Sequence, residues 1–377
     1  MRDNNQSTTA YSNCHRQQPL FLPEEIIFQI LLRFPVRSLL EFKRVCKSWK
    51  TLISDPKFAK RHFQSSMMNP SITHQHIFTS LLFCDPTKIV SFPMKPLLEN
   101  PSQRPNKHVE FCMEHKFLIL GSCNGLLCLF DMDQGYVKLW NPSIRLKSKK
   151  SPTLDCYDKW SISYNGFGYD HINDKYKLLV VVDRLSSHSI EKVTQIYTIG
   201  GTFWTTIQNF PFGATNYEGK FVSGTLNWVI VSSNQAVILS FDLENEIYKE
   251  VSLPQCDGVE ICNTRIGVLS NSICVCFDSK KTNWDFWLMK EYGVVESWTR
   301  LMMIPRENLW DRGQSYAPPS FIELLFIFEN GIVLLRTFTR LVLYNLSNGS
   351  LLDYIPDTDD IMTDHHIYYE SLVSPQF

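Results

Sequence analysis

Residues 22–58 read LPEEIIFQILLRFPVRSLLEFKRVCKSWKTLISDPKF, and this stretch decides the fold of the first part of the chain. Pro23 suits the first turn of a helix, where its missing N–H would have no partner, and the two glutamates that follow complement the positive end of the helix dipole. Apolar residues then recur four apart over 26–31. The sequence therefore predicts a helix with a broad apolar face.

A second helical pattern follows Pro35. Proline cannot donate a backbone hydrogen bond and disfavours helical geometry in the residue before it, so the first helix is expected to end there. Beyond it, apolar residues recur in steps of three and four, which is the spacing of a helical face. They are Leu39, Phe42, Cys46, Trp49 and Ile53. Lysines and arginines fill the polar side, and Ser54-Asp55-Pro56 ends the pattern, so we expect three short helices in all.

A segment this short buries too little surface to be a stable domain alone. Its apolar face needs a cover, which is either a second polypeptide or the rest of this chain. Fully burying each Leu, Ile or Trp contributes roughly 1.5–3 kcal/mol. Five or six such side chains at an interface would overcome an association cost of about 4–15 kcal/mol. The pattern alone fits both covers.

The segment resembles the F-box at nearly every diagnostic position. The matching residues are Leu22-Pro23, Ile26, Ile30-Leu31, Pro35, Leu39, Phe42, Val45-Cys46-Lys47, Trp49 and Leu52-Ile53. Phe34 is a mild departure that keeps the position apolar, since leucine is more usual there. F-boxes dock the Skp-type adaptor of cullin-RING ubiquitin ligases, so the resemblance implies that partner. The residues expected to bind the adaptor, or to support those that do, are Leu22, Pro23, Ile26, Ile30, Leu31, Leu39, Val45, Cys46 and Trp49.

The charge of the chain is unevenly distributed. Residues 1–64 carry 11 Lys and Arg against 5 Asp and Glu, whereas the rest of the chain carries 26 against 33. A basic segment can indicate nucleic acid binding. Here the cations lie mostly on the outer side of the predicted helices, and no basic stripe with interleaved aromatics follows. We therefore expect attraction to an acidic protein partner, or a solvated surface, and no nucleic acid.

The sequence also predicts a compartment. Residues 1–19 are polar, lack the apolar core of a signal peptide and are expected to be a disordered tail. The longest apolar runs are far shorter than the ~20 residues of a membrane span. The 11 cysteines lack the paired CxxC spacing of zinc or redox sites, which favours free thiols in a reducing compartment. We expect a soluble protein of the cytoplasm, the nucleus or both.

From about residue 72 the chain consists of short runs rich in β-branched and aromatic residues, separated by Asn, Gly, Asp and Pro, which predicts strands and tight turns. The runs recur at intervals of roughly 40–50 residues, the range of propeller blades. Five units are clear, and residues 72–92 are a candidate for a sixth. We expect a multidomain protein: a small all-α domain over 20–64, then an all-β, kelch-like propeller of six or more blades over 72–377.

Glycines and tryptophans have expected structural roles in these units. Gly125, Gly224 and Gly331 stand at strand starts, where a missing side chain lets the chain turn tightly. Large aromatic rings would fill the gaps between blades, and we favour this packing role over ligand stacking. The tryptophans concerned are Trp140, Trp204, Trp228, Trp287 and Trp298.

The second part of the chain is similar to the F-box-associated domain of plants, often called F-box/kelch-repeat. The matching strings lie at 121–128, 139–143, 166–170, 241–243, 290–293 and 369–373. Asn227 departs from the pattern, because the family often has histidine before the tryptophan, so no role is carried over to it. Together the two resemblances cover nearly everything from residue 20 to the end. They do not separate self-incompatibility pollen factors from defence regulators.

We find no catalytic pattern in the sequence. A copper site would need several His and Tyr converging on the propeller axis, and the 10 histidines are scattered. The chain has no GxSxG, no P-loop and no GxGxxG after a strand. Asp131 with Asp133, and Asp357 with Asp359 and Asp360, are interpreted as solvated turns rather than metal or acid/base sites. We expect no catalytic residues, no cofactor and no metal.

The resemblances imply a non-catalytic, substrate-recognition subunit of a Skp-cullin-F-box ubiquitin ligase with an unidentified protein target. Target recognition is expected on loops of one propeller face. The candidate connections are 147–163, 184–192, 255–264 and 306–319, of which the last offers Trp310 and Tyr316 as target-binding residues. Two alternatives stay open. One is an F-box propeller that binds a protein or glycan without cullin-dependent degradation, and the other is a carbohydrate- or small-molecule-binding propeller.

Overall fold

The computed structural model describes most of the chain. The described residues are 22–68, 75–81, 88–99, 108–156, 162–185, 190–211, 213–215, 217–232, 235–255, 259–279, 281–309, 321–337, 340–356 and 365–376. The expected tail over 1–19 lies outside them, as do the candidate target-binding residues Trp310 and Tyr316.

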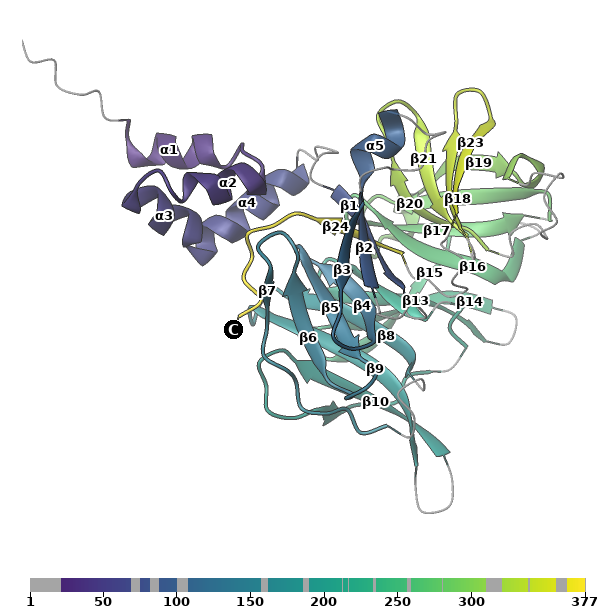
Figure 1. Cartoon of the computed structure of the whole chain (residues 1–377). Coiled ribbons are helices and arrows are strands. Elements are labelled where there is room, and N and C mark those ends of the chain that lie inside the picture. Colours follow the sequence, from purple (N-terminus) through teal and green to yellow (C-terminus); the bar gives the residue numbers. More distant parts are fainter. Residues whose placement is uncertain are drawn as a thin grey trace, which may run out of the picture.

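A bundle of helices stands beside the β-rich body (Figure 1). Its members are α1 Glu24–Leu31, α2 Val36–Phe42, α3 Lys47–Ser54 and α4 Pro56–Met68. The backbone carbonyl of Pro23 accepts hydrogen bonds from the amides of Ile26 and Ile27 at 3.0 and 3.1 Å, so α1 begins where the sequence predicts. The apolar stripe over 39–53 is not one helix, because Cys46 is extended (φ −157°, ψ 167°) and separates α2 from α3.

The structure adds α4 to the three predicted helices. The Asp55 Oδ1 accepts a hydrogen bond from the amide of Lys57 at 2.7 Å, and Pro56 occupies the first position, where a missing N–H costs nothing. Ser54-Asp55-Pro56 therefore ends one helix and begins another. The Nε2 of His62 on α4 lies 2.8 Å from the carbonyl oxygen of Phe34, which ties α4 to the turn between α1 and α2. No helix among the described residues is long and apolar enough to cross a membrane.

The described strands form six four-stranded antiparallel units. The first contains β24 His365–Tyr369, β1 Gln75–Leu81, β2 Lys88–Pro93 and β3 Val109–Cys112. The second contains β4 Phe117–Cys123, β5 Leu126–Asp131, β6 Val137–Asn141 and β7 Leu146–Lys147, and the third β8 Ile162–Asp170, β9 Lys175–Leu185, β10 Ile190–Thr198 and β11 Thr205–Thr206. The fourth contains β12 Glu218–Val222, β13 Thr225–Ser232, β14 Gln235–Asp242 and β15 Ile247–Ser252.

The fifth unit contains β16 Val259–Leu269, β17 Ser272–Ser279, β18 Asn283–Met289 and β19 Trp298–Pro305. The sixth contains β20 Glu323–Ile327, β21 Ile332–Arg336, β22 Arg340–Asn345 and β23 Ser350–Pro356. A short helix, α5 Met94–Glu99, follows β2, and the one-turn helices η2 Val295–Ser297 and η3 Arg306–Leu309 flank β19. Two parallel pairs, one of them Gly166 with Gly219, link β8 to β12 and so join the third and fourth units.

The six units form a propeller that the end of the chain closes. The first strands of successive units are neighbours, β4 beside β8, β8 beside β12, β12 beside β16, and β16 beside β20. In the first unit this inner place is taken by β24, which pairs with β1 from Gln75 opposite Tyr369 to Thr79 opposite His365 and also adjoins β4. The predicted propeller is confirmed, and the candidate sixth unit near the start of the body becomes complete only with this last strand.

The glycines and tryptophans have the predicted structural roles. Gly125, Gly224 and Gly331 have φ of 70°, 82° and 77° in the turns between the first two strands of their units. Trp140, Trp228 and Trp298 are buried, and Trp204 and Trp287 are half-buried. The Trp298 Nε1 donates to the Ser252 carbonyl oxygen at 3.0 Å and so joins the fifth unit to the fourth. Trp204 makes the equivalent bond to Pro152, also at 3.0 Å, between the third unit and the second.

Candidate functional site

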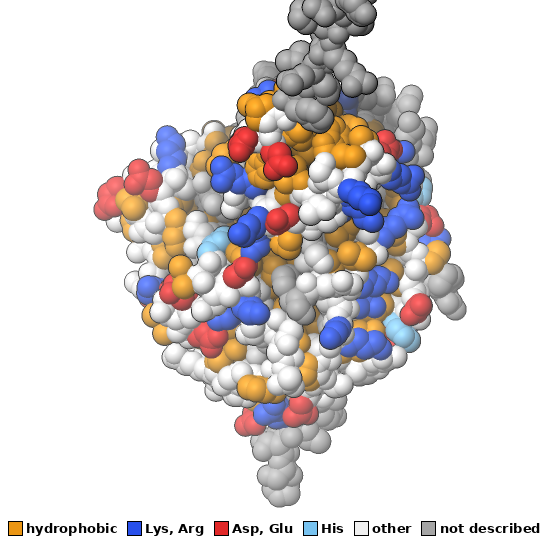
Figure 2. Space-filling model, turned by 90° about the vertical axis from the view of Figure 1, so that its left-hand side faces the viewer, with side chains coloured by type: hydrophobic (Ala, Val, Ile, Leu, Met, Phe, Trp, Pro, Cys, Tyr) orange, Lys and Arg blue, Asp and Glu red, His pale blue; other side chains and the backbone are white. Residues whose placement is uncertain are grey.

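The helical bundle exposes one apolar face and buries another. Four large side chains on the exposed face keep much of their surface accessible: Leu22 (58%), Ile26 (46%), Ile30 (42%) and Val45 (64%). Phe34, in the turn between α1 and α2, adds to this face. Figure 2 looks onto this side of the molecule and shows hydrophobic side chains gathered in its upper part, with Lys and Arg side chains around them. The propeller does not cover these residues, so they are available to another polypeptide.

The nine residues predicted for adaptor binding therefore divide by burial. Six are exposed: Leu22, Pro23, Ile26, Ile30, Val45 and Cys46. Leu31 and Leu39 are completely buried, and Trp49 is half-buried with its ring 5.6 Å from that of Phe42. The exposed six form a surface, whereas the other three support it from inside. The sequence pattern could not make this division, because both groups follow the same helical spacing.

Cations crowd the outer side of α2 and α3. Lys47 and Lys50 are exposed, and Lys43 lies close enough to Lys50 for their charges to interact. Partial burial, and then the neighbouring Lys50 charge, lower the pKa of the Lys43 ammonium. An acidic partner would relieve this repulsion between like charges.

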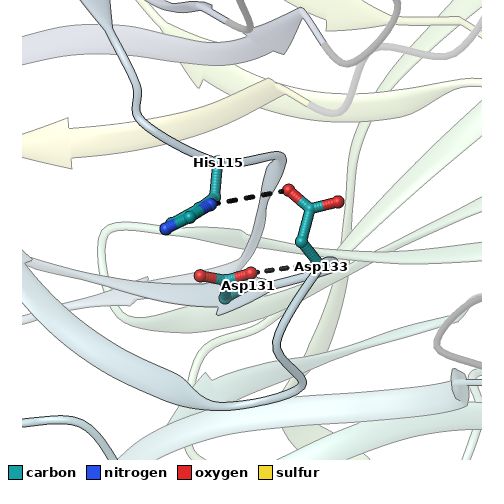
Figure 3. Close-up of side chains that lie close together, drawn as sticks. All are labelled: His115, Asp131 and Asp133. Atoms are coloured by element: carbon teal, nitrogen blue, oxygen red, sulfur yellow. Dashed lines mark hydrogen bonds and ion pairs between the residues drawn. The ribbon is translucent and has the colours of Figure 1, made fainter.

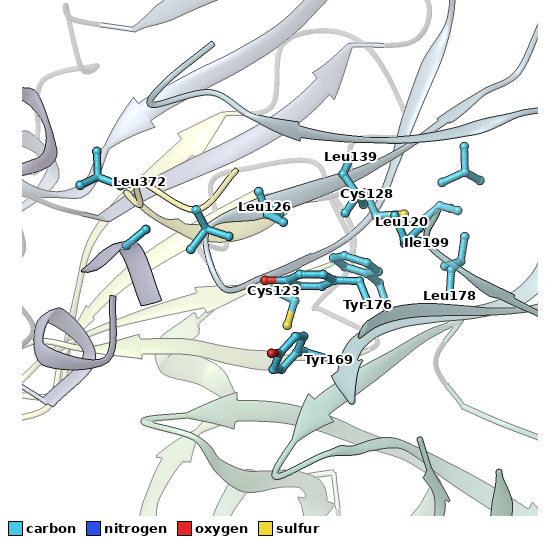
Figure 4. Close-up of a cluster of buried hydrophobic side chains, with 14 of the residues drawn as sticks. Leu120, Cys123, Leu126, Cys128, Leu139, Tyr169, Tyr176, Leu178, Ile199 and Leu372 are labelled. Atoms are coloured by element: carbon cyan, nitrogen blue, oxygen red, sulfur yellow. The ribbon is translucent and has the colours of Figure 1, made fainter. Parts of the chain in front are cut away.

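The second apolar face of the bundle is sealed against the propeller. One continuous cluster contains helical residues, including Leu31, Leu39 and Phe58, together with propeller residues such as Leu126 and Leu372. Figure 4 shows the propeller part of this cluster, with Leu372 beside the helices. At the edge of the contact, the Lys60 ammonium of α4 lies 2.7 Å from the Asp174 Oδ2 in the turn between β8 and β9. The rest of the chain therefore covers one apolar face of the helical bundle, and the other apolar face stays exposed for a second polypeptide.

The last described residues strap the helices to the propeller. After β24, the chain crosses the second unit and ends beside the helical bundle (Figure 1). The buried Asn141 amide at the end of β6 holds this segment, because its Nδ2 donates to the carbonyl oxygens of Ser371 (3.0 Å) and Val373 (2.8 Å). Its Oδ1 accepts from the Tyr368 hydroxyl at 2.9 Å. We call residues 370–376 the C-terminal strap.

Antiparallel hairpins place the turns of every unit on two opposite faces of the ring. Turns between first and second strands lie on the face that α4 meets, since Phe63 and Met67 of α4 border a cavity together with Asn124 and Asn271 from two such turns. Strand direction then puts the ends of β7, β9, β15 and β19, which lead into the connections to β8, β10, β16 and β20, on the far face. These are the four connections predicted to bind the target. The strands that lead into them therefore end on one side, away from the exposed helical face.

A buried network of charges surrounds the propeller axis. The Lys220 ammonium on β12 lies 2.8 Å from the Glu218 Oε2 and 2.9 Å from the Glu323 Oε1 on β20. The second carboxylate oxygen of Glu218 lies 3.3 Å from the His366 Nδ1 on β24, and Arg336 pairs with Glu323 at 2.5 Å. Burial alone would raise the pKa values of both carboxylates, but the adjacent cations hold them below their ordinary range.

One group of side chains has the composition of a metal site. His115, Asp131 and Asp133 lie together at the far face, with the His115 Nδ1 3.8 Å from the Asp133 Oδ2 (Figure 3). The Asp131 Oδ1 accepts hydrogen bonds from the amides of Asp133 and Gln134 at 2.9 and 2.8 Å. Asp170 and Asp242 make the same two bonds in other units. This recurring turn explains the position of Asp131 without an ion.

Two family models match the chain. The F-box domain matches residues 20–61, and the F-box associated beta propeller domain matches residues 76–318. An F-box/kelch-repeat protein of Arabidopsis thaliana is 31% identical over 365 residues, covering 95% of this chain and 96% of its own. The chain belongs to the F-box-associated β-propeller family. A second A. thaliana F-box protein is 26% identical over 376 residues, covering 89% of this chain and 87% of its own.

The family membership agrees with the observed order of an F-box and a propeller. F-box domains generally bind Skp-type adaptors in cullin-RING ligases, and both kinds of domain are typically non-catalytic adaptor modules. Among solved structures, a nidogen–laminin complex aligns with a TM-score of 0.45 and 10% identity, covering 78% of this chain and 99% of that one.

Proposed function

We propose that this chain is the substrate-recognition subunit of a Skp-cullin-F-box ubiquitin ligase. The exposed apolar face of α1 and of the turn before α3 docks the Skp-type adaptor, and the far face of the propeller captures a target protein. Other subunits carry out ubiquitin transfer, and this chain contributes proximity by holding target lysines near the charged conjugating enzyme. The buried thiols of the blades suit a reducing compartment, and we place the protein in the cytoplasm, the nucleus or both.

The uncovered helical face carries this proposal. An F-box that served only to pack on its own propeller would bury its apolar residues there, as Leu31 and Leu39 do. Ile26 and Ile30 instead remain exposed one helical turn apart on the same face of α1, with Leu22 and Val45 nearby in the same bundle. Burying such side chains contributes up to roughly 1.5–3 kcal/mol each, and the surrounding cations add attraction for an acidic partner.

Binding of the full-length protein to a purified Skp-type adaptor tests the proposal. The double variant Ile26→Glu, Ile30→Glu places two carboxylates in the apolar face and is expected to abolish binding in calorimetry. Ile247→Glu is the matched control, because Ile247 on β15 is 45% exposed and lies on the propeller. Equal adaptor affinity for wild type and the double variant, or no affinity in the wild type, would refute the proposed docking.

Capture of a target needs a separate measurement. Proximity labelling with the intact protein while the proteasome is blocked should enrich both the adaptor and a target protein. The Ile26→Glu, Ile30→Glu variant should keep the target and lose the adaptor. If the wild type labels a target that does not accumulate when the proteasome is blocked, the protein is instead a binding module that acts without degradation.

A further inference from the structure

A cavity of about 210 Å³ lies on the propeller axis, at the junction with the helical bundle. Residues from all six inner strands contribute to its wall, and Phe63 and Met67 of α4 border it on the helical side. Cavities of about 150 Å³ are large enough for a benzene ring. This cavity therefore has room for a small organic molecule.

The wall combines apolar surface with a few polar groups. Its rings include Phe63, Phe167 and Phe221, while Lys220 and His366 reach it from the charge network. An ammonium has three N–H donors, and two of those on Lys220 meet Glu218 and Glu323, which leaves one donor over. The His366 Nε2 is buried and has no hydrogen-bond partner among the described residues. Both residues line the same cavity, and Glu218 bonds Lys220 through one oxygen and the His366 Nδ1 through the other.

Both carboxylates around the cavity are paired with cations, and a third cation, Arg265, lies near enough to Glu323 for their charges to interact. The carboxylates of Glu218 and Glu323 are matched by Lys220 and Arg336, all with side chains at most 20% exposed. An ion entering this site would give up its hydration in a largely buried place whose carboxylates are already paired with cations, which is costly. A hydroxyl group carries no charge, can accept a hydrogen bond from Lys220, and can donate one to a neutral His366 Nε2 when Nδ1 carries the proton toward Glu218.

We propose that the axial cavity is a binding site for a small, uncharged, hydroxylated organic molecule with an apolar or aromatic body. The hydroxyl meets Lys220 and His366, and the body packs against the phenylalanines and Met67. Because its wall comes from both the propeller and α4, an occupant stabilises the junction between the domain that faces the adaptor and the domain that faces the target. The site does not depend on adaptor binding, so its test and that of the proposed function are independent.

Benzyl alcohol and benzoate are the probes for this site, because they have nearly the same shape and differ in charge. With the full-length protein, benzyl alcohol should give saturable binding in ligand-observed NMR and raise the Tm as its concentration rises. Benzoate should bind about tenfold more weakly or not at all. Equal saturation by both probes, or no saturation by benzyl alcohol, would overturn the proposal.

Two adjacent methionines supply matched variants. Met67→Trp fills the cavity from its helical side and should abolish benzyl alcohol binding, whereas Met68→Trp adds the same ring at an 81% exposed position and should leave it unchanged. Neither substitution touches the charge network. Benzyl alcohol binding that survives Met67→Trp would place the probe elsewhere and overturn the assignment. His366→Gln, which retains a polar side chain without the imidazole ring, should weaken benzyl alcohol binding and leave the weak or absent benzoate signal unchanged.

Discussion

Ile30 and Leu31 are neighbours on α1 that face opposite surroundings. Ile30 is 42% exposed on the open face, and Leu31 is fully buried in the cluster shared with the propeller. Leu31→Ala should lower the free energy of unfolding by about 2–5 kcal/mol, because it leaves a cavity in that cluster. Ile30→Ala should change stability by less than about 0.5 kcal/mol and should weaken adaptor binding instead.

Denaturant unfolding and adaptor titration of the two variants separate these effects. An Ile30→Ala variant as destabilised as Leu31→Ala would show that the open face is packed in solution, which contradicts the exposed position observed here.

Gly219 shows how tightly the first two strands of one blade are packed. A Cβ at this position would lie 2.3 Å from the Trp228 ring, which is itself completely buried and has no room to move. Gly219→Ala should therefore lower the Tm and cost roughly 1–3 kcal/mol of stability, the usual range for overpacking. Gly293→Ala is the control, since its φ of 80° brings strain but no atom lies within 4 Å of the added methyl group. A smaller Tm loss for Gly219→Ala than for Gly293→Ala would contradict the packing argument.

At the scale of single residues, the sequence predicted the backbone conformation of a residue better than the burial of its side chain. Pro23 before a helix and Gly125 in a tight turn have conformations that depend on their own chemistry, so both were predictable. Ile30 and Leu31 both fit the apolar helical pattern, and only Leu31 is buried in the cluster shared with the propeller. Its burial depends on a propeller that begins many residues later, so no local sequence pattern predicts it.

The C-terminal strap depends on one buried amide. Asn141→Ala removes the donors to Ser371 and Val373 and the acceptor for Tyr368, and it leaves these groups buried without those bonds. Each unsatisfied buried group costs about 1–3 kcal/mol, so we expect a loss of several kcal/mol and release of the strap. Asn245→Ala, which removes an exposed amide from a turn, is the control.

Carboxypeptidase digestion measures strap release directly. The Asn141→Ala variant should lose the last residues much faster than wild type and Asn245→Ala. Equal digestion of all three proteins would mean that the amide does not hold the strap.

Among the elements, the second and third strands of each unit were predictable and the innermost strands were less so. GLLCLFD before YVKLWN, for example, alternates and turns within a few residues. β12 is short and contains Glu218 and Lys220, which are polar because they face the axis rather than a blade. β24 closes the first unit from the far end of the chain, so only the folded ring reveals its role. α4 was missed because a proline can begin a helix as well as end one.

At the scale of the whole molecule, the exposed helical face and the proposed target face are held in one arrangement. α4, the contact between Lys60 and Asp174, and the C-terminal strap join the bundle to one side of the ring. The connections proposed to bind the target leave from the other side. Proximity raises reaction rates only where geometry permits simultaneous engagement, so a fixed junction suits a subunit that positions its target.

The charge network on the axis should make the stability of the propeller depend on pH. Glu218 and Glu323 have pKa values below the ordinary 4.5 in the folded protein. Their contribution to the free energy of unfolding is therefore fully present above pH 4.5, and it is lost as the pH falls toward the pKa values of the folded protein. Glu218→Gln should cost about 3 kcal/mol at neutral pH, because it leaves Lys220 and His366 without this carboxylate. The difference in free energy of unfolding between this variant and wild type should shrink below pH 4.5. Urea unfolding across this range measures it, and a difference that does not change with pH would contradict the ionic role.

The uneven charge of the chain should control how fast the adaptor binds. Within the helical bundle, Lys43 and Lys50 lie close enough for their charges to interact, whereas the rest of the chain carries an excess of acids. Long-range attraction raises the association rate of an acidic partner, and salt screens it with a Debye length of about 10 Å at 0.1 M. The association rate measured by stopped flow should therefore fall severalfold as salt rises, with little change in dissociation.

Lys43→Glu with Lys50→Glu should slow association and flatten this salt dependence. Lys249→Glu with Lys290→Glu changes the total charge equally but on the propeller, where both residues are exposed, and should have a much smaller effect. If both double variants slow association equally, net charge rather than the position of these lysines steers the adaptor.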